Sequence, residues 1–317
     1  MSGDIRIGIS GWTYAPWRGR FYPKGLAQKR ELAFAAEVFG TIEINGTFYG
    51  LQTPNAFGRW ADETPDGFIF SVKGSRYITH MLKLRNAETA LANFFASGVL
   101  RLGPRLGPIL WQFPAQMTFR PEVFETFLAQ LPRTTGEAAA IARRHDARLK
   151  APAWLTCEDA PMRHAFEIRH DSFRDPAFAD LLAAHNAALV CADTETWPLL
   201  LDATADFVYC RLHGGEELYV SGYDDDALEV WAARARLWAE GNEPTDGDRI
   251  RPPGPKRREG RDVFVYFDND VKVRAPADAE AMECKLGLKQ YALVDTRSGG
   301  EEQARGRAPA MRSPARA

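Results

Sequence analysis

Short apolar runs with strand-like alternation recur along the whole chain, and stretches with helical spacing separate them. Eight such runs cover residues 5–12, 41–49, 68–74, 107–114, 164–170, 187–193, 206–214 and 262–270. Apolar residues at every second position indicate strands, whereas intervals of three and four residues indicate helices. The predicted helices between the runs include residues 29–39, 87–100, 176–186 and 226–240.

The alternation of strands and helices predicts an α/β fold with a parallel sheet. Asp175 followed by Pro176 is a typical start for one of these helices. Eight strand–helix units in 317 residues favour a closed (β/α)8 TIM barrel. No GxGxxG motif follows the first run, so an open dinucleotide-binding sheet is not favoured.

We therefore expect a single barrel domain over residues 1–296. Two segments interrupt the regular repeat as insertions. Residues 133–163 contain an extra helical stretch and a proline-containing loop, and residues 241–261 are rich in proline, glycine and charge, which predicts a long mobile loop. Residues 297–317 have few apolar positions and several arginines, which predicts a disordered tail.

Polar and charged residues stand near the end of almost every predicted strand. In a barrel, one face of each strand points to the helices and the other points into the barrel. In "HAFEIRH", Phe166 and Ile168 would face the helices and Glu167 and Arg169 would face inward. The strand ends supply further inward candidates, which are Glu43, Asn45, Lys73, Gln112, Asp193, Arg211, His213, Asp268 and Asn269.

These residue types suggest binding and proton transfer at the barrel mouth, where barrel enzymes have their active sites. Arginine and lysine suit a phosphate or carboxylate, so Arg169, Arg211 and Lys73 are expected to bind an anion. Glu167, His213 and Asp193 are the expected acid–base groups. The alternative is that these charges form ion pairs with a purely structural role.

Other side chains near the strand ends extend this candidate site. Trp12 and Tyr49 follow the first and second strands, where they could stack on a ligand or form a hydrophobic lid. His80 follows the third strand and is a second histidine candidate, beside His213, which precedes Gly214 and Gly215.

Composition narrows the class of protein. The chain has 40 Lys and Arg against 42 Asp and Glu, so its near-zero net charge of −2 does not favour a general nucleic-acid or membrane binder. Its four cysteines show no CxxC spacing, which favours free thiols in a reducing compartment over a zinc site. No apolar run has the ~20 residues of a membrane helix, so a cytoplasmic location is expected.

Seven ordered motifs stand out over roughly residues 5–290: "GISGWTYAPWRGRFYP", "IEINGTFYGLQTP", "FSVKGSRYITH", "LGPILWQFP", "FEIRHDSF", "YCRLHG" and "VYFDND". In these motifs the chain resembles the YecE-like barrel family, also called domain of unknown function 72. The resemblance implies a TIM barrel and nominates no catalytic residue. The chain departs from it at Gly46, at Phe173 and at Asp268-Asn269-Asp270, where many members have Asn-Asn-His.

Three functions remain open. The first is an enzyme that acts on a small anionic or sugar-like substrate. The second is a metal-dependent phosphodiesterase or endonuclease, in which Glu43, Glu167, Asp193, His213 and Asp268 would hold one divalent ion, although few histidines are available for a zinc site. The third is a non-catalytic binding or scaffold protein. We favour the first; no cofactor is required by the sequence, and the oligomeric state is open.

Overall fold

The structure is a computed structural model that describes residues 2–155, 158–214, 222–269 and 273–288. The predicted tail at residues 297–317 lies outside the described residues, as does Asp270. Most of the segment between His213 and Gly222 also lies outside them.

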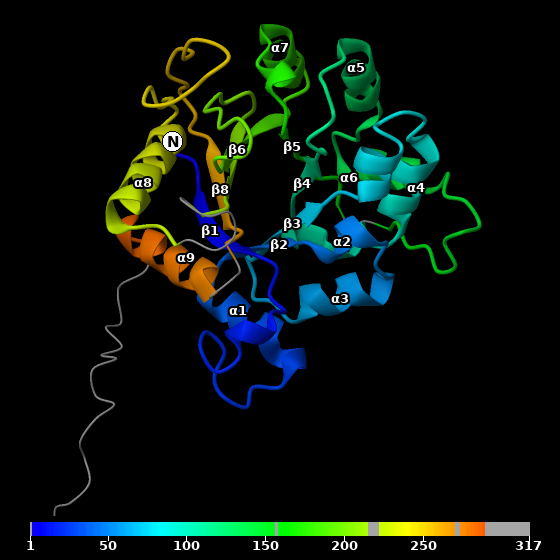
Figure 1. The fold of residues 1–317 in the computed structure, drawn as a ribbon. Helices are drawn as coiled ribbons and strands as arrows, with labels where there is room; N and C mark the ends of the chain where they lie inside the picture. The colour runs from blue at the N-terminus through cyan, green and yellow to red at the C-terminus, as the bar shows by residue number, and fades with distance from the viewer. Residues whose placement is uncertain (1, 156–157, 215–221, 270–272, 289–317) are drawn as a thin grey trace, which may run out of the picture.

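Eight parallel strands close into a barrel, as the sequence predicts (Figure 1). The strands are β1 (Ile5–Ser10), β2 (Thr41–Ile44), β3 (Ile69–Lys73), β4 (Leu106–Gln112), β5 (His164–Glu167), β6 (Ala188–Asp193), β7 (Phe207–Leu212) and β8 (Asp262–Phe267). Each strand pairs with the next one in sequence, and β8 pairs with β1 to close the ring, with Val263 beside Ile5. The (β/α)8 prediction is confirmed.

Helices surround the barrel (Figure 1). They are α1 (Glu31–Val38), α2 (Gly46–Tyr49), α3 (Pro54–Asp62), α4 (Glu88–Ala96), α5 (Pro121–Gln130), α6 (Thr135–Ala142), α7 (Pro176–Ala184), α8 (Asp225–Ala239) and α9 (Arg274–Lys285). Short helical turns are η1 (Ala15–Trp17), η2 (Gln28–Arg30), η3 (Tyr77–Met81), η4 (Val99–Arg105) and η5 (Asp171–Phe173). Among the described residues, no helix combines the length and the apolar character that crossing a membrane requires.

Local sequence explains where several elements begin and end. The Asp175 side chain accepts a hydrogen bond from the Ala177 N–H and Pro176 opens α7, as predicted. The second strand is shorter than its apolar run, because the chain turns into α2 after Ile44. The Thr47 hydroxyl in that turn donates to the carbonyls of Ile44 (3.1 Å) and Lys73 (2.6 Å), which fixes α2 against the end of β3.

The two insertions take different forms. Residues 133–163 contain α6, as the sequence predicts. Residues 241–261 contain no helix or strand, but hydrogen bonds tie the segment to the barrel. The Asp202 carboxylate accepts from the N–H groups of Ile250 (2.8 Å) and Arg251 (2.9 Å), and Arg249 Nη1 donates to the Leu201 carbonyl at 3.0 Å.

Alternation along the strands divides the core into two layers. Outward residues such as Ile42 and Phe166 join the large core beneath the helices. Inward residues fill the barrel, and small side chains on β5 and β6 pack against large ones on β7 and β8. This inner cluster consists of Leu110, Ala165, Ala188, Val190, Ala192, Ala205, Phe207, Tyr209, Phe264 and Tyr266. Charged inward residues gather at the carboxyl ends of the strands, which we call the barrel mouth; they include Glu43, Glu167 and Arg211.

Candidate functional site

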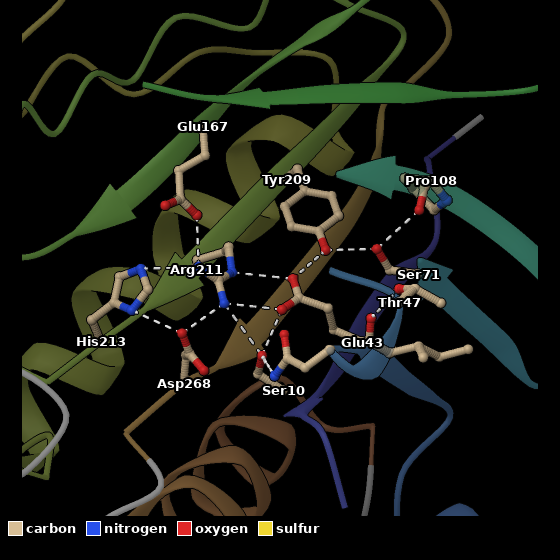
Figure 2. A network of polar contacts seen from close by, with 12 residues as sticks. Ser10, Glu43, Thr47, Ser71, Pro108, Glu167, Tyr209, Arg211, His213 and Asp268 are labelled. Carbon is tan, nitrogen blue, oxygen red and sulfur yellow. Dashed lines mark hydrogen bonds and ion pairs between the residues drawn. The ribbon is translucent and has the colours of Figure 1, made fainter. Parts of the chain in front are cut away.

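Arg211, on the inward face of β7, lies at the centre of the polar residues at the mouth (Figure 2). Its Nη1 donates to Glu167 Oε2 (2.6 Å), and its Nη2 donates to Asp268 Oδ2 (2.6 Å) and Glu43 Oε1 (2.9 Å). Its Nε donates to Glu43 Oε2 at 3.1 Å. These four residues, which we call the Arg211 network, join β2, β5, β7 and the residue after β8 through one buried guanidinium.

The Arg211 network keeps its charges despite burial. Burial alone raises the pKa of the Glu167 carboxyl, but Arg169 and then Arg211 outweigh burial and hold that pKa well below its usual range. Asp268 behaves likewise: burial raises its pKa, and Arg211 and then His213 lower it further than burial raises it. Both carboxyls are therefore ionised at neutral pH, so the buried guanidinium is compensated by several anions.

Two hydroxyl groups also donate hydrogen bonds to the Glu43 carboxylate. Ser10 donates to Glu43 Oε1 (2.5 Å) and Tyr209 donates to Glu43 Oε2 (2.6 Å). The Tyr209 hydroxyl also lies 2.6 Å from Ser71 Oγ, and the Asn45 amide donates to Ser10 Oγ at 2.9 Å. Ser10 and Tyr209 were not among the predicted site residues. Extending the inward alternation to uncharged hydroxyl residues would have found both.

His213 follows Arg211 on the inward face and is fully buried. Its Nδ1 lies 3.1 Å from Asp268 Oδ2, and its Nε2 lies 3.5 Å from Arg211 Nη1. The edge of Trp197 packs against the imidazole with ring centroids 5.5 Å apart. Both ring nitrogens thus face members of the Arg211 network. His213 therefore helps to hold the side chains of Asp268 and Arg211 in place.

Arg169 is one of two cations that reach the edge of the network. Its Nε and Nη2 donate to Glu167 Oε1 at 2.8 and 2.6 Å, and its guanidinium lies 4.0 Å from the Trp197 ring centroid. The side chain is 16% exposed. Within the described part of the chain, no residue accepts a hydrogen bond from its Nη1. Trp197 was not predicted, because it belongs to a loop after β6 that has no alternation.

Lys73 is the second cation at this edge, and it is only 8% exposed. Its Nζ lies 4.7 Å from the ring centroid of Phe48, and none of the described residues accepts a hydrogen bond from it. Burial, followed by Arg211, lowers the pKa of Lys73 to about 8, against the opposing attraction of Glu43, Asp268 and Glu167. The ammonium and the free amine are therefore both populated near neutral pH.

His80 lies near the same two cations. The edge of its imidazole packs on Phe48, with ring centroids 5.1 Å apart, and its Nδ1 lies 2.8 Å from Thr79 Oγ1. Burial lowers the pKa of His80 first, and the charges of Arg169, Lys73 and Arg76 lower it further. The cations Lys73, Arg76 and Arg169 thus act on His80 from the β3 and β5 side of the mouth.

Two predicted inward residues face the helices instead. Asp193 accepts a hydrogen bond from Trp231 Nε1 on α8 (2.9 Å), because Ala192 is the inward residue beside Arg211. The prediction that Asp193 joins the other carboxylates is wrong. Asn269 follows the inward Asp268 and therefore points outward, where its amide donates to Asp278 Oδ2 on α9 at 2.8 Å.

The remaining candidates are dispersed. Gln112 is beside Glu167 in the strand register and is nearly buried. Tyr49 is 68% exposed on α2, where Arg76 lies 5.3 Å from its ring centroid. Trp12 packs on Trp60 and on the outward Phe70, beside a separate cavity of about 910 Å³. The structure therefore does not bring Trp12 to the Arg211 network.

The carboxylates at the mouth do not fit a divalent metal site. Arg211 donates to Glu43, Glu167 and Asp268, so a cation already occupies the position that a shared metal would take. Across residues 2–155, 158–214, 222–269 and 273–288, no three His, Cys, Asp or Glu side chains are grouped as metal ligands.

Comparison with known proteins decides the family. The model of "Protein of unknown function DUF72" matches residues 6–303. The chain belongs to the DUF72 family. A curated relative of this DUF72 chain, the UPF0759 protein YecE of Escherichia coli K12, is 31% identical over 131 residues, which are 40% of the chain and 44% of YecE. The UPF0759 protein YunF of Bacillus subtilis is 27% identical over 35% of the chain and 40% of YunF. The matches thus span less than half the length of these curated relatives.

Solved structures of DUF72 proteins share the fold. A crystal structure of a DUF72 family protein from Thermotoga maritima superposes with a TM-score of 0.67 at 21% identity, covering 90% of the chain and 99% of that protein. One from Enterococcus faecalis gives a TM-score of 0.61 at 15% identity, covering 90% of the chain and 96% of that protein. At these identities the likeness concerns the barrel fold alone.

Proposed function

We propose that this DUF72 chain is an enzyme that binds a small substrate carrying a carboxylate or phosphate at the barrel mouth. The observation that carries this proposal is the pair of cations at the edge of the Arg211 network. Arg211 itself is saturated by carboxylates, whereas Lys73 Nζ and Arg169 Nη1 have no hydrogen-bond acceptor among the described residues.

Charge and geometry both favour an anion here. Arg169 is held in place by Glu167 on one side and by the Trp197 ring on the other, so its guanidinium is oriented before a ligand arrives. A preoriented guanidinium suits a carboxylate or phosphate, because it offers planar N–H donors. Lys73 and Arg76 add positive potential on the same side.

Proton transfer in this proposal falls to Lys73 rather than to the three groups expected from the sequence. Glu167 accepts hydrogen bonds on both carboxylate oxygens, and both nitrogens of His213 face partners in the network. Asp193 lies outside the network. Lys73 has a pKa of about 8 and no acceptor among the described residues, so it can gain or lose a proton near neutral pH.

Removal of the Arg169 guanidinium tests the anion site. We expect Arg169→Met to weaken binding of inorganic phosphate, pyruvate or ribose 5-phosphate by about 10- to 150-fold, since one charge-assisted hydrogen bond contributes about 1.5–3 kcal/mol. Isothermal titration calorimetry at pH 7 measures this change. Neutral glucose should bind less tightly than ribose 5-phosphate to the unaltered protein.

The matched control is Arg20→Met, because Arg20 is an exposed arginine in the loop after β1 that contacts no residue of the Arg211 network. This variant should bind the same anions as tightly as the unaltered protein. Equal affinities for Arg169→Met and Arg20→Met, or no binding of any of the three anions, would contradict the proposed anion site.

A further inference from the structure

Lys73 has features that electrostatic binding of an anion does not require. An anchoring lysine is normally protonated and hydrated, yet this side chain is 8% exposed and its Nζ rests 4.7 Å from the Phe48 ring centroid. The Lys73 backbone is fixed as well, since its carbonyl accepts from Thr47 Oγ1 at 2.6 Å. Such a lysine has an oriented amine in an apolar setting.

We infer that Lys73 is a nucleophile that forms a Schiff base with a carbonyl compound bearing a carboxylate or phosphate. This inference rests on the proposed anion site and names the substrate class for it. In this step the Lys73 nitrogen bonds to the carbonyl carbon. The carbonyl oxygen leaves as water with two protons from the amine, and an imine remains.

The surroundings of Lys73 favour the free amine that this step requires. Arg211 on β7 faces Lys73 and disfavours the ammonium, as burial does. The carboxylates of Glu43, Glu167 and Asp268 also attract the Lys73 ammonium, but each of them forms an ion pair with Arg211. These ion pairs weaken the stabilisation that the carboxylates give to the ammonium. An ordinary lysine, by contrast, is almost wholly protonated at neutral pH and reacts poorly with carbonyls.

Two neighbours suit the substrate and the proton movements. Arg169 can hold the carboxylate or phosphate while the carbonyl carbon approaches Lys73. His80 packs on the same Phe48 ring as Lys73, and its lowered pKa leaves the imidazole neutral near pH 7. A neutral imidazole can take a proton from the attacking amine and return it to the departing oxygen.

Reductive trapping tests the inference. The full chain is incubated with pyruvate and sodium cyanoborohydride between pH 6.5 and 9, and modified lysines are located by peptide mass spectrometry. We expect Lys73 to be modified at least about tenfold faster than the exposed Lys24 at pH 7.5, because more of its amine is unprotonated than in an ordinary lysine. We also expect Arg169→Met to slow modification at Lys73 and to leave modification at Lys24 unchanged.

Calorimetric titration with inorganic phosphate separates the two proposals. Phosphate binding together with modification spread over exposed lysines, and none at Lys73, would overturn the Schiff-base inference and leave the anion site standing. Absence of both phosphate binding and Lys73 modification would overturn both. Total modification that is as fast in Lys73→Met as in the unaltered protein would also contradict the inference. Lys24→Met, by contrast, should still be modified at Lys73.

Discussion

Arg211→Met is expected to destabilise the protein by about 3–5 kcal/mol at pH 7, which is the usual cost of removing one partner from a buried ion pair. The substitution leaves Glu43, Glu167 and Asp268 buried around a neutral side chain. Urea unfolding followed by circular dichroism measures the change. The loss should shrink as the pH falls, because the carboxyls then become protonated in the variant and no longer repel one another.

Two further variants test whether the cause is the buried charge. Arg163→Met removes a partly exposed arginine that pairs with Asp262 at 2.7 Å, and it should cost less than about 1 kcal/mol. Adding Glu43→Gln to Arg211→Met should recover part of the lost stability, since it removes one of the uncompensated carboxylates. A loss for Arg211→Met as small as that for Arg163→Met would contradict the central place given to Arg211.

Lys73→Met is expected to stabilise the protein at pH 7, by at most about 3 kcal/mol. The folded protein lowers the pKa of Lys73 from 10.5 to about 8, so below pH 8 the folded state must hold an unfavourable buried ammonium. The unfolded chain binds more protons between these two values. The stability of the unaltered protein should therefore rise as the pH increases from about 8 toward 10.5.

Urea unfolding of both proteins between pH 7 and 10 measures this difference. Lys73→Met should lack the rise that Lys73 contributes, so the two stabilities should converge as the pH increases. Lys24→Met, which alters an exposed lysine, should follow the unaltered protein at every pH. A Lys73→Met variant that is less stable at pH 7 would show that the ammonium is favourably paired. If Lys73→Met is more stable and also loses reductive trapping by pyruvate, Lys73 lowers stability while serving function, as residues at functional sites often do.

The barrel was predictable from sequence because each strand has its own apolar alternation. The same alternation predicts that Glu43, Lys73, Glu167 and Arg211 lie on the inward face, and all four are buried there. A closed parallel barrel brings the carboxyl ends of all its strands together. Residues of matching alternation on different strands are therefore neighbours even when they are far apart in the chain.

The two wrong placements lie at the end of strand β6 and just past strand β8, where alternation still decides which face a side chain occupies. Asp193 and Asn269 each lie one position past an inward residue, and a shift of one position moves a side chain to the opposite face. The central place of Arg211 depends on the strand register, which sets the height at which each side chain meets its neighbours. Trp197 comes from a loop, where no periodic pattern indicates which way a side chain points.

Titration of Lys73 in the presence and absence of an anion tests the proposed site most directly. With lysines labelled by ¹³C at the carbon next to Nζ, nuclear magnetic resonance should show one lysine that titrates near pH 8 and is missing from Lys73→Met. Adding inorganic phosphate should raise the pKa of that lysine, because a bound anion stabilises the ammonium. A lysine that keeps the same pKa when phosphate is added, or no lysine that titrates below about pH 10, would contradict an anion site beside Lys73.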